Sequence, residues 1–137
     1  RIGEFTNLII KPNRYEAAKA AHSEKVEEPS TELARQCART LRQRTCRPVY
    51  LTLDKEGICP LDESGYFPVP CPPVTGPIDI VGAGDSTTAG IVSALASGAS
   101  LAEAAVVGNL VGGLTFVGAT LYSTHYKTAP KRTGAGR

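Results

Sequence analysis

Residues 82–85 read Gly-Ala-Gly-Asp and lead directly into a run of small, helix-compatible residues that stops at Gly98. Gly82, Ala83 and Gly84 carry little or no side chain, so successive backbone N–H groups can converge on an anion at the start of a helix, assisted by the helix dipole. The turn therefore predicts a phosphate-sized site at the N-terminus of a helix over residues 84–97.

Asp85 follows this turn immediately, although a carboxylate beside an anion site repels phosphate. Its position makes chemical sense if it removes a proton from an attacking hydroxyl while the neighbouring amides hold a phosphoryl group in transfer. The alternative is that Asp85 only caps the helix. The turn matches neither the dinucleotide fingerprint nor the P-loop, so the residues alone leave both interpretations open.

Length and composition narrow the class of protein. A chain of 137 residues predicts one domain, and a net charge of +2 without a clustered excess indicates no nucleic-acid partner. The cysteines have neither Cys-x-x-Cys pairs nor histidines at zinc-site spacing, which predicts reduced, structural thiols. They are Cys37, Cys46, Cys59 and Cys71. No signal-peptide pattern is present, so we expect a cytoplasmic protein, and the missing methionines suggest a fragment.

Hydrophobic periodicity predicts alternating strands and helices. Residues 8–10 form an apolar run that favours a strand and that Pro12 ends. An alanine-rich segment predicted as a helix follows, and Ser30 is the expected N-cap of a second helix. Residues 49–53 favour a strand, and a further extended segment follows. This alternation suggests a parallel α/β layer. Arginines 35, 39 and 42 lie on one face of the second helix, which is more typical of a solvated face than of a phosphate contact.

A further helix is predicted to begin at Ser100, which forms a capping box with Glu103 and starts a helix paired with the preceding one. No formally charged side chain follows Glu103 until Lys127, so a membrane span is one alternative, and the Gly108–Gly112 spacing would suit it. Asn109 and the repeated glycines instead favour a buried helix packed against a sheet, and they weaken a long helix. Residues 127–137 are expected to be a disordered tail.

The stretch over residues 79–92 resembles the C-terminal signature of ribokinase-like (PfkB) carbohydrate kinases, through its aspartates, the Gly-Ala-Gly-Asp turn and the Ala89–Gly90 pair. Residues 11–16 look like the family's Asn-x-x-Glu element, and residues 51–58 look like its nucleotide-side strand and turn. The resemblance implies the C-terminal portion of a ribokinase-like fold, with a parallel sheet flanked by helices and with the N-terminal half and lid absent. Residues 1–126 would form this partial kinase domain.

The family resemblance implies ATP-dependent phosphorylation of a sugar or related small alcohol. Asp85 would be the catalytic base, with Gly82, Ala83 and Gly84 as the anion hole. Asn13 and Glu16 would organise Mg²⁺ through water, which suits an ion that prefers oxygen ligands and retains its hydration. Thr52 and Gly57 would approach the nucleotide phosphates, and Asn109 would border the base.

Each of the weaker assignments also has a structural alternative. Asn13 and Glu16 could cap the loop after Pro12, Thr52 could fill a strand, and Gly57 could make a turn. Asn109 could pair with a neighbouring backbone group.

Two positions depart from the family pattern. Ile80 stands where threonine is common, so a site for a monovalent cation such as K⁺ would use the Asp79 side chain and the Ile80 carbonyl. Asp54 replaces an expected glycine and would bring a negative charge near phosphates unless it points to solvent. We expect a small-molecule partner and no membrane association. The full-length protein could form a homodimer.

The N-terminal half that carries most sugar contacts in the family has no counterpart here, so no residue identifies the sugar. A parallel sheet without its remaining strands would expose an apolar edge. We therefore expect the isolated chain to be weakly folded and nearly inactive. The alternative function is a noncatalytic nucleotide-binding or interaction module derived from such a kinase.

Overall fold

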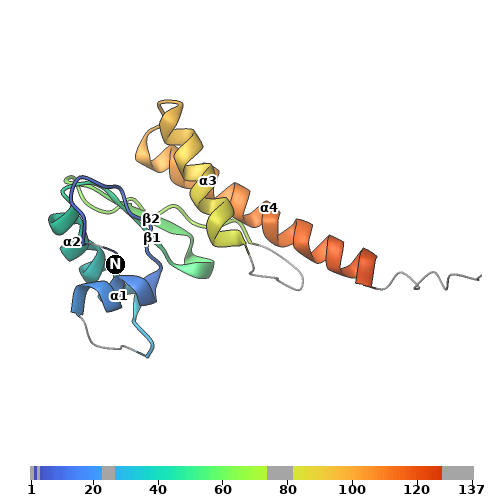
Figure 1. The fold of residues 1–137 in the computed structure, drawn as a ribbon, viewed down its shortest axis with the longest axis horizontal. Helices are drawn as coiled ribbons and strands as arrows, with labels where there is room; N and C mark the ends of the chain where they lie inside the picture. The colour runs from blue at the N-terminus through green and yellow to red at the C-terminus, as the bar shows by residue number, and fades with distance from the viewer. Residues whose placement is uncertain (1, 3, 23–26, 74–81, 128–137) are drawn as a thin grey trace, which may run out of the picture.

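The computed structural model describes residues 2, 4–22, 27–73 and 82–127, with side chains of α4 described as far as residue 115. Two helices lie on one side of a strand pair and two on the other, and the last helix extends well past its partner (Figure 1). The elements in order are α1 (Arg14–His22), α2 (Thr31–Thr45), β1 (Val49–Thr52), the 3-10 helix η1 (Asp54–Glu56), β2 (Ile58–Leu61), α3 (Ala83–Ala96) and α4 (Leu101–Lys127).

The sheet differs from the predicted parallel layer. β1 and β2 pair antiparallel, with Val49 opposite Leu61 and Thr52 opposite Ile58. Parallel pairing among the described residues is limited to isolated bridges between residues 10–13 and β1. Pro12 has no N–H to donate, which prevents a complete parallel ladder. The prediction also missed β2, because Pro60 within it reads as a break in a strand.

β1 separates two apolar cores because successive side chains of a strand point to opposite faces. Val49 and Leu51 belong to the core formed with α1 and α2. Tyr50 points the other way, into the core formed with α3 and α4. Its hydroxyl donates to the Leu101 carbonyl at 3.2 Å, and burial raises the pKa of Tyr50 to about 12, so the donor stays protonated.

α2 begins where its sequence predicts. The Leu33 N–H donates to Ser30 Oγ at 3.2 Å, which confirms the N-cap. The arginine face is not simply solvated, since Arg42 pairs with Glu63 at 2.8 Å and the Arg39 guanidinium lies 5.4 Å from the centre of the Tyr66 ring. These arginines therefore contact the turn after β2.

α3 and α4 form the expected pair, and they run antiparallel (Figure 1). The Ser100–Glu103 capping box is present, with the Ser100 N–H donating to Glu103 Oε2 at 2.8 Å and the Glu103 N–H donating to Ser100 Oγ at 3.3 Å. α4 is nevertheless a continuous helix of 27 residues despite its glycines. It ends at Lys127, which the sequence placed in the tail, while residues 128–137 lie outside the described part of the chain.

Gly108 and Gly112 of α4 face α3, and Gly108 also faces β2, so that these glycines allow close approach. A Cβ at Gly108 would lie 2.7 Å from Ile91 Cγ1 and 3.2 Å from Ile58 Cδ1. This contact gives the glycines a packing role within the protein. Over the described residues, no helix combines the length and apolar character that crossing a membrane requires.

Replacing Gly108 by alanine is therefore expected to destabilise the chain by roughly 1–3 kcal/mol through overpacking. Gly113→Ala is the matched control on the same helix, because a Cβ there meets nothing within 4 Å. It should be neutral or stabilise by up to about 1 kcal/mol, since alanine favours a helix more than glycine does. Urea unfolding followed by circular dichroism measures both changes, and shifts of the same sign and size would contradict the packing argument.

Candidate functional site

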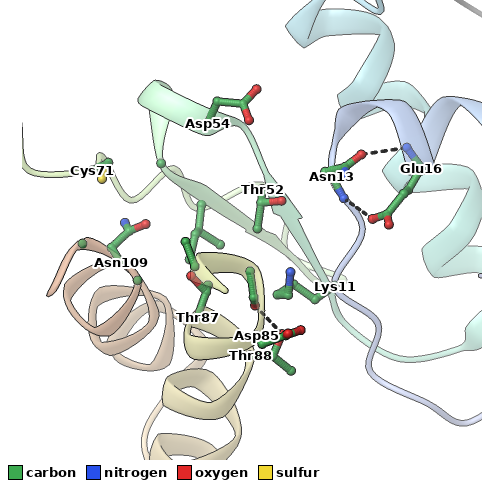
Figure 2. A pocket seen from close by; sticks show the side chains of 16 residues that line it. Lys11, Asn13, Glu16, Thr52, Asp54, Cys71, Asp85, Thr87, Thr88 and Asn109 are labelled. Atoms are coloured by element: carbon green, nitrogen blue, oxygen red, sulfur yellow. Dashed lines mark hydrogen bonds between the residues drawn. The ribbon is translucent and has the colours of Figure 1, made fainter. Parts of the chain in front are cut away.

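A cavity of about 450 Å³ lies between the start of α3, the β1–β2 turn, residues 11–16 and the middle of α4. Figure 2 shows side chains from these four segments around it. Most of the predicted site residues line this cavity, although Gly82 does not. They are Asn13, Glu16, Thr52, Gly57, Ala83, Gly84, Asp85 and Asn109.

The N-terminus of α3 opens onto the cavity without a capping side chain. Gly82 is the N-cap residue in a left-handed conformation, with φ of 85°, and provides no side-chain hydrogen bond. The N–H groups of the first helical turn have no intrahelical acceptor, which leaves them available to an anion. Thr88 Oγ1 donates to the Gly84 carbonyl at 2.8 Å and fixes this turn.

Asp85 lies in that first turn, the N-cap residue is Gly82, and no side-chain hydrogen bond caps α3. Its side chain is exposed and lines the cavity. Among the described residues, its carboxylate makes no hydrogen bond or ion pair. The group is therefore open to a ligand in the cavity.

Asn13 and Glu16 bind each other's backbone at the start of α1 (Figure 2). The Asn13 N–H donates to Glu16 Oε2 at 2.9 Å, and the Glu16 N–H donates to Asn13 Oδ1 at 2.8 Å. The capping alternative thus describes their contacts, while both residues also line the cavity. The described residues contain no group of three acidic, His or Cys side chains arranged to hold a metal, so protein ligands alone do not build a cation site there.

Position 57 accepts only glycine, because of its backbone conformation and the close approach of neighbouring atoms. Its φ is 94°, and an added Cβ would lie 2.2 Å from the Val69 carbonyl oxygen. Thr52 lies on the opposite arm of the turn, where its hydroxyl donates to the Pro12 carbonyl at 3.4 Å. Both residues therefore have the structural roles considered for them and also face the cavity.

Asp54 occupies a left-handed backbone position, with φ of 52°, that asparagine, aspartate and glycine tolerate best. Its carboxylate lies 3.2 Å from Arg14 Nε and is 68% exposed. Figure 2 shows this side chain directed away from Asp85. The substitution for glycine is therefore accommodated with the negative charge turned towards Arg14.

Asn109 is buried on α4 and holds the segment after β2. Its Nδ2 donates to the Val69 carbonyl at 3.0 Å and to the Pro70 carbonyl at 3.2 Å. The backbone-pairing alternative is thus present in the structure. Because the residue also lines the cavity, it fixes the wall formed by residues 69–71.

The sequence did not identify several other lining residues, among them Lys11, Cys71, Thr87 and Thr88. Thr88 follows Gly84 by one helical turn, a spacing that could have indicated a shared face. No local sequence pattern indicates Lys11 or Cys71, because they reach the cavity only through contacts between segments that are distant in the sequence. Asp79 and Ile80, the expected monovalent-cation residues, lie outside the described part of the chain.

Comparisons with known proteins give one consistent family. The model of the pfkB family carbohydrate kinases matches residues 8–120. YegV, an uncharacterized sugar kinase of Escherichia coli strain K12, is 34% identical over 103 residues, which cover 75% of this chain and 30% of YegV.

Solved structures agree with this match. Phosphofructokinase-2 from Escherichia coli, in complex with substrates and products, superposes with a TM-score of 0.65 and 28% identity, covering 79% of this chain and 34% of that one. Arabidopsis thaliana ribokinase, complexed with ribose and ATP, has a TM-score of 0.69 at 21% identity, covering 80% and 34%, and shows the shared ribokinase-like fold. The chain thus spans about a third of the length of these relatives. It belongs to the pfkB family of carbohydrate kinases.

Proposed function

We propose that this chain supplies the C-terminal, nucleotide-binding and proton-accepting part of a kinase that transfers phosphate from ATP to a hydroxyl of a sugar or related small molecule. The observation that carries the proposal is the exposed Asp85 carboxylate beside uncapped N–H groups at the start of α3, in a cavity shared with three other segments. Anion-binding amides next to a free carboxylate suit phosphoryl transfer better than simple anion binding.

In this mechanism Asp85 accepts the proton of the acceptor hydroxyl as its oxygen attacks the γ-phosphorus. The bond from that phosphorus to the β–γ bridging oxygen breaks, and ADP leaves with the electron pair. The N–H groups of residues 83–85 hold the phosphoryl oxygens during the transfer. Thr52 and Gly57 border the remaining phosphates, and Asn109 borders the base.

Asn13 and Glu16 would hold Mg²⁺ through its water molecules. Their oxygen atoms suit this ion, and their mutual hydrogen bonds at 2.8 and 2.9 Å keep both side chains at the cavity edge. When bound, Mg²⁺ would neutralise charge on the ATP phosphates. A monovalent cation such as K⁺ at Asp79 and the Ile80 carbonyl, and a homodimer of the full-length protein, remain predictions.

The relatives support the reaction class. Phosphofructokinase-2 was solved with its substrates and products, and the ribokinase with ribose and ATP. A sugar acceptor therefore fits the family, while the choice of sugar would depend on parts of a kinase with no counterpart in this chain.

A chain in which residues 1–137 are joined to the remaining part of a pfkB-family kinase should consume ATP only when both Mg²⁺ and an acceptor are present. Coupled ADP detection over a panel of sugars, sugar phosphates and nucleosides measures this dependence. Equal ADP release without any acceptor, or no transfer to any member of the panel, would contradict the proposed reaction. We expect the chain alone to turn over little, because it spans about a third of its relatives.

A second candidate is a nucleotide-binding module without catalysis, and the observation behind it is Asp54, an acidic residue in the β1–β2 turn that lines the cavity. The same assay separates the two candidates when ATP binding is measured in parallel. Retained binding without transfer in the joined chain would favour the module.

A further inference from the structure

We propose that the Thr87 hydroxyl recognises the amino group of the nucleotide's base, an inference that rests on the proposed function. Thr87 is half-buried on α3, one helical turn after Gly84, and it lines the cavity. Figure 2 shows its side chain between Asp85, at the proposed site of phosphoryl transfer, and Asn109 on the opposite wall. This position lies on the side of the cavity where the base would bind.

The Thr87 hydroxyl has no hydrogen-bond partner among the described residues, although the Ala83 carbonyl lies one helical turn before it. A threonine inside a helix commonly donates to the carbonyl four residues earlier. Thr40, Thr88 and Thr115 do so in this structure, at 3.3, 2.8 and 3.0 Å. Thr87 departs from this pattern, so its hydroxyl is free to bind a ligand in the cavity.

Gly112 keeps the space in front of this hydroxyl open. It lies on α4 opposite Thr87, and a Cβ at this position would overlap Thr87 Oγ1. Any residue with a side chain at position 112 would therefore displace or cover the hydroxyl. Gly112 also lines the cavity, so the hydroxyl can be reached from within it.

Asn109 offers a hydrogen-bond acceptor on the same wall, since it lies on α4 three residues before Gly112. The residue is only 7% exposed, and its Nδ2 donates to the Val69 and Pro70 carbonyls. Its Oδ1 receives no hydrogen bond from the described residues and points to the cavity side in Figure 2. A buried acceptor without a donor is costly, which favours a ligand that supplies one.

Two oxygen acceptors on one wall suit an amino group, because an amino group carries two N–H donors. The 6-amino group of adenine can donate one N–H to Asn109 Oδ1 and the other to Thr87 Oγ1. Guanine has a carbonyl oxygen at the same place on its ring, and this oxygen would face Asn109 Oδ1 with no proton between them. The pair therefore selects adenine nucleotides, with Thr87 as the second contact to the amino group.

The test compares ATP with purine riboside triphosphate, whose base is adenine without the 6-amino group. Isothermal titration of the 137-residue chain with each nucleotide in Mg²⁺ should show tighter binding of ATP. Thr87→Val keeps the shape and removes the hydroxyl, so it should weaken ATP binding about fivefold and change binding of the analogue by less than about twofold. Thr87→Ser keeps the hydroxyl and should retain most of the preference for ATP.

Thr115→Val is the matched control, because it makes the same change on α4 at a residue that does not line the cavity. The Thr115 hydroxyl already donates to the Val111 carbonyl. This variant should bind both nucleotides as the unsubstituted chain does.

Each outcome bears on a separate claim. Equal losses for ATP and the analogue in Thr87→Val, or an unchanged ATP affinity, would overturn the role of Thr87 while leaving the proposed kinase function intact. If circular dichroism shows that the chain alone is unfolded, the chain joined to the remaining part of a pfkB-family kinase is titrated in its place. If the folded protein binds neither nucleotide, the proposed function fails and this inference fails with it.

Discussion

Asp85→Asn is expected to lower kcat by roughly 10²–10⁴-fold in a chain joined to the remaining part of a pfkB-family kinase, because asparagine cannot accept the acceptor's proton. ATP affinity should change little, since the substitution keeps the size of the side chain and leaves the α3 amides in place. Steady-state ADP release and a separate ATP titration measure the two effects.

Asp62→Asn is the matched control for this substitution. Asp62 lies in the turn after β2, outside the cavity, where its Oδ1 accepts a hydrogen bond from the Ser64 N–H at 2.6 Å. Asparagine can accept the same bond, so turnover should be unchanged. Turnover by Asp85→Asn equal to that of the control would remove Asp85 from the mechanism.

Gly57→Ala is expected to destabilise the chain by roughly 3 kcal/mol, with contributions from backbone strain and from a close contact. The φ of 94° disfavours any side chain, and the new Cβ would lie 2.2 Å from the Val69 carbonyl oxygen and 2.5 Å from the Cys71 nitrogen. Both neighbours are backbone atoms, so rotation of a side chain cannot relieve the contact. Urea unfolding measures the loss.

Gly98→Ala separates the two contributions. Gly98 has a similar φ of 89°, but a Cβ there meets nothing within 4 Å, so only the conformational cost of about 1–2 kcal/mol applies. If the two alanine variants lose equal stability, the segment at residues 69–71 moves aside at little cost. In that case the fit around Gly57 does not fix the cavity wall.

Local signals in the sequence predicted the helix ends well. Ser30, Gly98 and the Ser100–Glu103 pair each act within one or two helical turns, so their residue types alone define a start or a stop. The direction of strand pairing has no such local signal. It depends on contacts between distant residues, and Pro12 and Pro60 disguise the segments that pair with β1.

The candidate site was predictable where a motif carries it. Ala83, Gly84 and Asp85, which the motif singles out, are consecutive in the sequence and all line the cavity. The spacing of Asn13 and Glu16 is that of a helix cap and also that of the family motif. In the structure the two residues cap α1 and line the cavity at the same time. Lys11 could not be singled out, because its proximity to α3 arises only when residues 10–13 pair with β1.

The position of β1 between two apolar cores gives it a mechanical consequence. Tyr50 packs on one face of β1 and Val49 on the other. If the pair α1 and α2, or the pair α3 and α4, separates from β1, the core on the opposite face is therefore disturbed as well. The cavity of the candidate site lies across both cores and is lined by residues from α1 to α4. A ligand bound there would contact both helical pairs. Saturating nucleotide should therefore make the two pairs unfold together at a higher melting temperature.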